Sequence, residues 1–212
     1  MTNMKILFQG DSVTDAGRDR SDPHDMGTGY PKYASAMISD AYPDIDFEFI
    51  NLGISGNRTE HLIARLQSDF VDIAPDVVVL LIGVNDVWHH FSHDIDTPAE
   101  TFESNLRHIL TTIKETMGAK LLMVEPFLLY GSDKVHMLEE LDEKIRIERT
   151  LAQELADAYL PMHAIFAAET VSTPCTEFSG DGVHPSEGGS CFIAERVLHA
   201  IEPILTEWIE NQ

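Results

Sequence analysis

Residues 77–83 read VVVLLIG, a nearly continuous apolar run in which three valines precede two leucines and an isoleucine. A run of this kind that ends in glycine is typical of a strand buried on both faces at the centre of a parallel sheet. Residues 5–9, 47–52 and 120–125 have the same character, and we expect strands there as well. A weaker fifth strand is predicted near residues 160–163.

The segments between these apolar runs have the periodicity of helices. Apolar side chains recur at three- and four-residue steps over residues 102–117, 138–155 and 192–208. Thr97, Pro98 and Glu100 resemble a capping box that would start the first of these helices, and Gly118 is placed to end it. Alternating strands and helices predict an α/β fold. We expect a three-layer α/β/α sandwich with a five-stranded parallel sheet, in a single domain over residues 1–212.

The composition is that of a globular protein with a strongly acidic surface. The chain has 212 residues, of which 43% are hydrophobic and 24% are charged, so it can bury a core of ordinary size. Its formal net charge of −22 repels phosphate backbones and anionic lipid surfaces, so nucleic acid and membranes are poor partners. The charge weakly favours a neutral small-molecule substrate, although acidity that serves only solubility is the simpler explanation.

Cysteine usage and the N-terminal residues bear on location. Cys175 and Cys191 have no CxxC spacing, so free thiols in a reducing compartment are expected. The apolar run before Gly10 is too short for the core of a signal peptide. No apolar stretch approaches the roughly 18 residues of a membrane span. The sequence therefore predicts a cytoplasmic protein.

Chemistry in a parallel sheet is expected beyond the carboxyl ends of the strands. The first such loop is GDSVTD, which presents the hydroxyl and the backbone N–H of Ser12 at the rim of the sheet. A serine that only caps the next helix is the competing interpretation of this motif. No glycine follows Ser12 at the second position, so the loop is not the GxSxG elbow of α/β-hydrolases.

Two further loops offer hydrogen-bond donors. In NLGISGN, the backbone N–H of Gly53 can approach a reacting atom because no Cβ blocks it, although a glycine also serves an ordinary turn. In GVND, the side chain of Asn85 follows a buried strand and can stabilise an oxyanion. An Asx turn or a helix cap is the alternative role of this asparagine.

The motif DGVHP precedes the C-terminal helix. Asp181 and His184 lie three residues apart, so a turn can place the carboxylate against the imidazole Nδ1. Nε2 is then free to take a proton from a serine. Each motif alone is common, but together they supply a nucleophile, oxyanion donors and an acid–base pair in order along the chain.

The four motifs resemble the sequence blocks of the SGNH (GDSL) hydrolase family, in the order of that family and over residues 10–184. The resemblance implies that Ser12 is the nucleophile, that His184 is the general base and that Asp181 orients it. It implies an oxyanion hole made by the N–H groups of Ser12 and Gly53 and the side chain of Asn85. It also implies the SGNH-hydrolase, flavodoxin-like sheet, with no metal and no cofactor.

Finer details are similar to one branch of that family, the intracellular acetylxylan esterases. The similarity is carried by GDSVTDAGR with Arg18, by GTGY, by NLGISGN and by GVNDVW. It implies a serine esterase that removes acetyl groups from small substrates such as acetylated xylo-oligosaccharides. A lipase-like or lysophospholipase-like enzyme and a thioesterase are the alternatives within the family.

Substrate contacts are expected from Asp11, Tyr30 and Trp88 near the catalytic loops. Tyr30, Trp88 and Phe91 can form apolar platforms for a sugar ring, or they can pack beneath those loops. The branch often carries arginine after the tryptophan of GVNDVW, where this chain has His89, and this departure weakens the expectation of sugar recognition.

Two other classes of protein compete with an esterase. A metal-dependent hydrolase would use the segment WHHFSHD and carboxylates at strand ends, namely His89, His90, His93, Asp94, Asp11 and Asp86. Three histidines in one polar segment are more often solvated than bound to a metal. A sugar-binding module without catalysis is the second rival, and the retained serine, histidine and acid argue against it. A homo-oligomer stays possible, because interface residues look like core residues in a single sequence.

Overall fold

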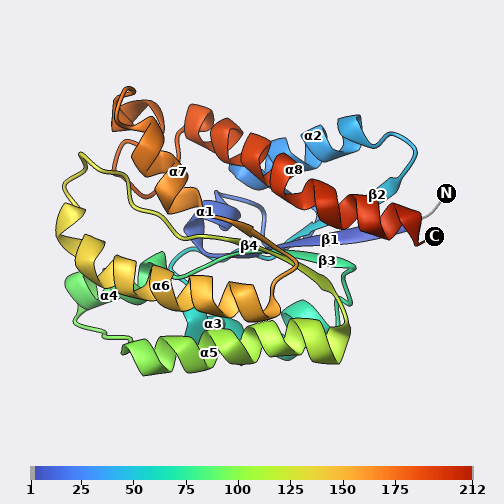
Figure 1. The fold of residues 1–212 in the computed structure, drawn as a ribbon, viewed down its shortest axis with the longest axis horizontal. Coiled ribbons are helices and arrows are strands. Elements are labelled where there is room, and N and C mark those ends of the chain that lie inside the picture. The colour runs from blue at the N-terminus through green and yellow to red at the C-terminus, as the bar shows by residue number, and fades with distance from the viewer. Residues whose placement is uncertain (1–2, 212) are drawn as a thin grey trace.

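The computed structural model describes residues 3–211 and has one five-stranded parallel sheet between two layers of helices (Figure 1). The strand order is β2-β1-β3-β4-β5, and every neighbouring pair is parallel. The strands are β1 (Asn3–Gly10), β2 (Asp46–Asn51), β3 (Val77–Leu81), β4 (Lys120–Val124) and β5 (Ala158–Leu160). The expected three-layer fold is confirmed, and the run that predicted the central strand forms β3.

Eight α-helices and four short 3₁₀ or π segments connect the strands in the described part of the chain. The α-helices are α1 (Ser12–Asp15), α2 (Tyr30–Ala41), α3 (Thr59–Ala64), α4 (Val84–His93), α5 (Ala99–Thr111), α6 (Leu138–Leu155), α7 (Met162–Glu169) and α8 (Glu187–Glu210). The shorter segments are η1 (Gln67–Val71), η2 (Thr112–Met117), η3 (Val135–Met137) and η4 (Cys175–Glu177). Within residues 3–211, no helix combines the length and the apolar character needed to cross a membrane.

Both faces of β3 are buried, and alternate residues belong to different cores. Val77, Val79 and Leu81 join the core under α2, α7 and α8. Val78 and Leu80 join the core under α3 and α5. These two helix layers lie above and below the sheet in Figure 1. Burial on both faces explains why the run is apolar at every position instead of alternating.

Two local expectations are wrong. The fifth strand is Ala158–Leu160, about two residues earlier than predicted, because Pro161 lacks an N–H for the ladder and α7 begins at Met162. The capping box at Thr97 does not form: Pro98 is the N-cap of α5, and the Thr97 hydroxyl instead accepts a hydrogen bond from Arg58 Nη1 at 3.0 Å.

The expected end of that helical segment is confirmed. Gly118 follows η2 with φ of +69°, a left-handed conformation that glycine adopts without a Cβ penalty. The chain then enters β4, which pairs with β3 from Val77↔Lys120 to Leu81↔Val124. This register brings the carboxyl ends of both strands to the edge that carries the loops described next.

Candidate active site

Ser12 lies in the loop where β1 runs into α1. Asp11 is the N-cap of α1, and its Oδ1 accepts the N–H of Val13 at 3.0 Å. Gly10 must be a glycine, because a Cβ there would lie 2.1 Å from the carbonyl oxygen of Leu81 on the neighbouring strand. The turn therefore places Ser12 at the first position of a helix, where backbone N–H groups have no intrahelical partner.

The structure brings Ser12, His184 and Asp181 together, as the sequence predicts. The Ser12 Oγ lies 2.9 Å from His184 Nε2, across a separation of 172 residues. His184 Nδ1 lies 2.8 Å from Asp181 Oδ2. The aligned atoms form a path for one proton between the hydroxyl and the imidazole, with the carboxylate behind the ring.

Asp181 is held as a carboxylate by the turn that carries it. Partial burial on its own raises the pKa of this carboxyl. The N–H groups of His184 and Val183, which donate to Oδ1 at 2.8 and 2.9 Å, and the His184 side chain outweigh burial and lower the pKa to about 2. A carboxylate that is ionised at neutral pH keeps the proton of His184 on Nδ1, so Nε2 presents its lone pair to Ser12.

The glycine expected to donate to an oxyanion is not placed to do so. The Gly53 N–H donates to Asn51 Oδ1 at 3.0 Å. Gly53 is a glycine because α1 passes over it: a Cβ there would lie 2.5 Å from the backbone nitrogen of Asp15. The expectation for Gly53 is therefore wrong, since its donor is already used.

Gly56, in the same loop, takes the position expected of Gly53. Gly56 lines one pocket together with Ser12 and Asn85, and its φ of +81° favours glycine. Among residues 3–211, no protein acceptor is recorded for its N–H. The sequence showed two glycines in NLGISGN, and only the close packing of Gly53 on α1 separates their roles.

Asn85 lies in the first turn of α4 and points toward the same pocket. One hydrogen of its side-chain amide donates to the carbonyl oxygen of Asn57 at 3.1 Å, which fixes the orientation of the group. An amide has two such hydrogens, so one donor stays available to a bound oxygen atom. The adjacent Asp86 accepts from the Thr59 hydroxyl at 2.7 Å and from the Thr59 N–H at 3.1 Å, which joins α4 to α3.

The pocket over Ser12 has a volume of about 310 Å³. Its lining residues come from the β1–α1 turn, the loop after β2, the helix α4 and the DGVHP turn, namely Ser12, Ser55, Gly56, Asn85, Trp88, His89, Ser92, His93 and His184. The Trp88 ring lies 5.5 Å from the His184 ring, between centroids. Trp88 is therefore placed where the sequence expected a substrate contact.

Other expected substrate contacts lie elsewhere. Tyr30 is fully buried: its ring packs edge-on against Phe8, and its hydroxyl lies 3.3 Å from Thr14 Oγ1. Asp11 is also fully buried beneath Ser12. Phe91 is exposed but contacts the His136 ring, outside the pocket over Ser12. The direct substrate contacts expected of Tyr30 and Asp11 are therefore not supported.

Lys134 also contacts the candidate active site, and it is not among the residues predicted from the sequence. Its Nζ donates to the backbone oxygen of Asp181 at 3.1 Å and lies 4.0 Å from Asp181 Oδ2. The same Nζ lies 5.0 Å from the centre of the Trp88 ring. The loop after β4 was among the expected places for chemistry, but no motif distinguished this lysine within it.

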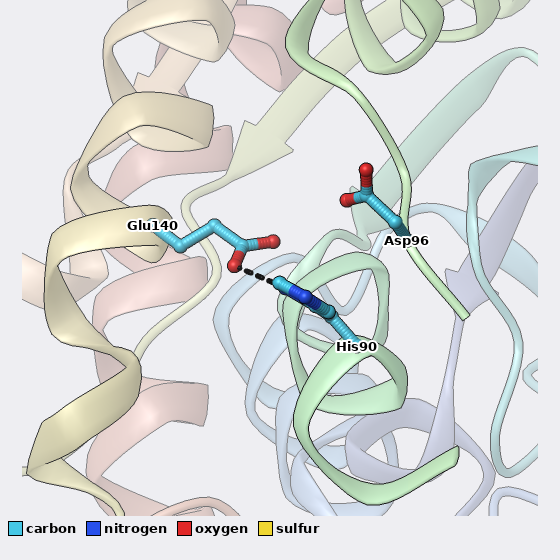
Figure 2. A group of neighbouring side chains, drawn as sticks. All are labelled: His90, Asp96 and Glu140. Carbon is cyan, nitrogen blue, oxygen red and sulfur yellow. Dashed lines mark hydrogen bonds and ion pairs between the residues drawn. The ribbon is translucent and has the colours of Figure 1, made fainter. Parts of the chain in front are cut away.

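The histidines of WHHFSHD do not form one ligand set. His89 and His93 line the pocket over Ser12, whereas His90 Nδ1 lies 2.8 Å from Glu140 Oε2 of α6. Figure 2 shows His90, Glu140 and the neighbouring Asp96, whose potential ligand atoms all lie within 4.8 Å of one another. His90 and Asp96 are exposed, and the His90–Glu140 pair adds a polar contact between α4 and α6, which also share a buried apolar cluster.

Comparisons with known proteins define the class to which the chain belongs. Residues 8–190 match the model of the GDSL-like Lipase/Acylhydrolase family. The chain therefore belongs to this family, and it is a carboxylic ester hydrolase. The family membership expected from the four motifs is confirmed.

Comparisons with individual proteins indicate which ester hydrolases the chain is similar to. The chain is 30% identical to an acetylxylan esterase of Geobacillus stearothermophilus over 98% of this chain and 97% of that protein. A solved structure of an acetylxylan esterase from the same organism has a TM-score of 0.86 at 29% identity, over 93% and 94% of the two chains. A structure described as a GDSL-like lipase of Parabacteroides merdae has a TM-score of 0.89 at 32% identity, over 94% and 95%.

Replacing Asp11 tests its buried position. Burial, with only Val13 N–H as a close partner, raises the pKa of Asp11 from its usual 3.8 to about 7. The folded protein thus keeps a proton that the unfolded chain loses, so stability falls as the pH rises from about 4 to about 7. Asn caps a helix as well as Asp does, and Asp11→Asn should raise the melting temperature, by more at pH 8 than at pH 4.

Asp15→Asn provides the matched control from the same turn. Burial opposes ionisation of Asp15, but bonds from Arg20 and Ser55 outweigh it and hold its pKa below the usual value. This variant should therefore lose stability at neutral pH. The melting temperatures are measured by calorimetry. A lower melting temperature for Asp11→Asn than for the wild type at pH 8 would show that the buried carboxyl of Asp11 does not reduce stability.

Proposed function

We propose that Ser12 attacks the acyl carbon of small acetyl esters, with His184 as general base and Asp181 as its orienting partner. The observation that carries the proposal is the unbroken relay of 2.9 and 2.8 Å from Ser12 Oγ through the imidazole to the carboxylate. Serine is a weak nucleophile unless an adjacent base takes its proton, and this relay supplies that base.

The reaction proceeds in two halves that use the same imidazole. As the Ser12 oxygen bonds to the acyl carbon, its proton moves to His184 Nε2, and the protonated ring then gives that proton to the departing alcohol. Water next attacks the acyl-enzyme, again losing a proton to His184. Return of that proton to Ser12 releases the carboxylic acid and restores the enzyme. The carboxylate of Asp181 stabilises the imidazolium in both halves.

The oxyanion of each tetrahedral intermediate needs donors beside Ser12. We assign this role to the N–H of Ser12, the N–H of Gly56 and the free amide hydrogen of Asn85. All three residues line the same pocket, and Gly53 has no free donor to contribute. Preorganised donors of this kind stabilise charge as it develops and cost little reorganisation.

The proposed substrates are acetylated xylo-oligosaccharides. Support comes from the relative named an acetylxylan esterase, which matches nearly the whole chain. The cytoplasmic location stays part of this proposal, because Cys175 and Cys191 are both free thiols, as in reducing compartments.

A substrate panel tests this choice. We expect acetylated xylobiose to give a higher kcat/KM than long-chain nitrophenyl esters or acyl thioesters. The comparison uses initial rates of the purified protein with each substrate. A preference for a long-chain ester or a thioester would favour the lipase-like or thioesterase alternative instead.

The nucleophile is tested with Ser12→Ala. The variant should stay folded, and its hydrolysis of 4-nitrophenyl acetate should fall by about 10³-fold or more, since the covalent path is lost. Phenylmethylsulfonyl fluoride should add mass to the peptide that contains Ser12 in the wild type. Ser35→Ala, at a partly buried position of α2, is the control and should keep both activity and labelling. Wild-type turnover in Ser12→Ala would refute the assignment.

The oxyanion donor is tested with Asn85→Ala. Loss of one such donor costs on the order of 3 kcal/mol in the barrier, which corresponds to about 100-fold in kcat. The melting temperature must be recorded as well, because Asn85 also bonds to the carbonyl of Asn57. A decrease in kcat of less than about 5-fold in a stably folded variant would show that the side chain does not reach the oxyanion.

A further inference from the structure

One face of α4 runs from the proposed oxyanion site to the mouth of the pocket. The pocket-lining residues of this helix follow the i, i+3, i+4, i+7, i+8 pattern of one helix face, and they are Asn85, Trp88, His89, Ser92 and His93. A helix rises about 1.5 Å per residue, so this face extends roughly 12 Å away from Asn85. A molecule whose ester group reaches Ser12 has its remaining length alongside this helix.

The hydrogen bonds of Ser92 determine which nitrogen of His93 is available to a ligand. The Ser92 hydroxyl donates to the carbonyl oxygen of Trp88 at 2.8 Å. Its oxygen must then accept from His93 Nδ1–H, which lies 2.6 Å away, because a hydroxyl has a single hydrogen. His93 Nε2 is therefore left without hydrogen in the neutral ring and offers a lone pair.

His89 lies one helical turn before His93, and the ring centroids are 5.0 Å apart at an angle of 59°. Burial, and then the positive charges of Arg58 and His93, lower the pKa of His89, so this ring stays neutral at physiological pH. Within residues 3–211, no hydrogen-bond partner is recorded for either of its ring nitrogens. The two imidazole rings on one wall thus present apolar faces, the unpartnered nitrogens of His89 and the Nε2 of His93.

We propose that the α4 face holds the alcohol half of the ester, and that His89 and His93 select alcohols that carry several hydroxyl groups. The His89 ring can donate to one hydroxyl and accept from another, and His93 Nε2 can accept from a further hydroxyl. An alkyl chain would bury these nitrogens without partners. The Trp88, His89 and His93 rings supply apolar surface for the C–H faces of a sugar ring. This inference rests on the proposed function, since it places the ester group at Ser12.

The test compares two acetyl esters that share the acyl group and differ in the alcohol. One is acetylated xylobiose, and the other is 4-nitrophenyl acetate, which has no hydroxyl group. The ratio of their kcat/KM values isolates recognition of the alcohol, because any general damage to catalysis cancels. We expect the ratio to fall about 5-fold in His89→Ala or His93→Ala and about 30-fold in the double variant, as each lost hydrogen bond predicts.

His90→Ala is the matched control, because it removes an imidazole from the other side of the same helix. Its ratio should equal that of the wild type. An unchanged ratio in the double variant, or no measurable turnover of acetylated xylobiose by the wild type, would overturn the inference. Failure of the proposed function itself looks different: hydrolysis of 4-nitrophenyl acetate would then survive Ser12→Ala.

Histidines four residues apart on a helix can also bind a transition metal, and the same experiment distinguishes this case. Wild-type ratios should be identical with EDTA and with micromolar zinc chloride if the rings bind hydroxyl groups directly. If the wild-type ratio falls to the double-variant value after EDTA treatment and recovers with zinc, the two histidines bind a metal ion instead of hydroxyl groups directly.

Discussion

The contact between the Ser12 hydroxyl and the His184 ring depends on the order of the sheet. The two atoms lie 2.9 Å apart although 172 positions separate their residues. β1 is an inner strand, flanked by β2 and β3, and its carboxyl end therefore lies where three loops converge. His184, the other residue of the contact, precedes α8, and α8 packs beside α2 over the same sheet (Figure 1). A parallel sheet collects strand ends at one edge, and this geometry makes the site possible.

Buried polar contacts hold the loops of that edge in place, but burying their charged groups costs folding free energy. The Asp86 carboxylate accepts from Thr59, and Asp15 accepts from the Ser55 hydroxyl and N–H at 2.9 and 2.8 Å. These bonds position the second loop against α1 and α4, and they offset the loss of solvation fully for Asp15 but only in part for Asp86, whose pKa stays raised at about 6. Burial raises the pKa of Asp11 further, to about 7, because its Oδ2 has no partner in residues 3–211. The site thus includes two buried carboxyls, Asp11 and Asp86, that reduce stability at neutral pH.

The layers, four of the five strand positions and the three residues of the relay are predictable from the sequence, because each leaves a local signature. Apolar runs and short motifs report directly on burial and on turns. The errors concern long-range packing. Gly53 and Gly56 look alike in the sequence, and only the packing of α1 against Gly53 separates them. Tyr30 resembles a binding residue, but its ring packs against Phe8 of the inner strand β1. Thr97 has the pattern of a cap, but the guanidinium of Arg58, distant in sequence, takes its hydroxyl.

The distance in sequence between Ser12 and His184 has a consequence for synthesis of the chain. Chains emerge from the ribosome at about 5–20 residues per second, so Ser12 is exposed for roughly ten seconds or more before His184 exists. A nascent chain at that stage carries an ordinary hydroxyl, since no imidazole accepts its proton. Under the proposed mechanism, an incomplete chain that ends before His184 therefore has no esterase activity, although Ser12 is already present.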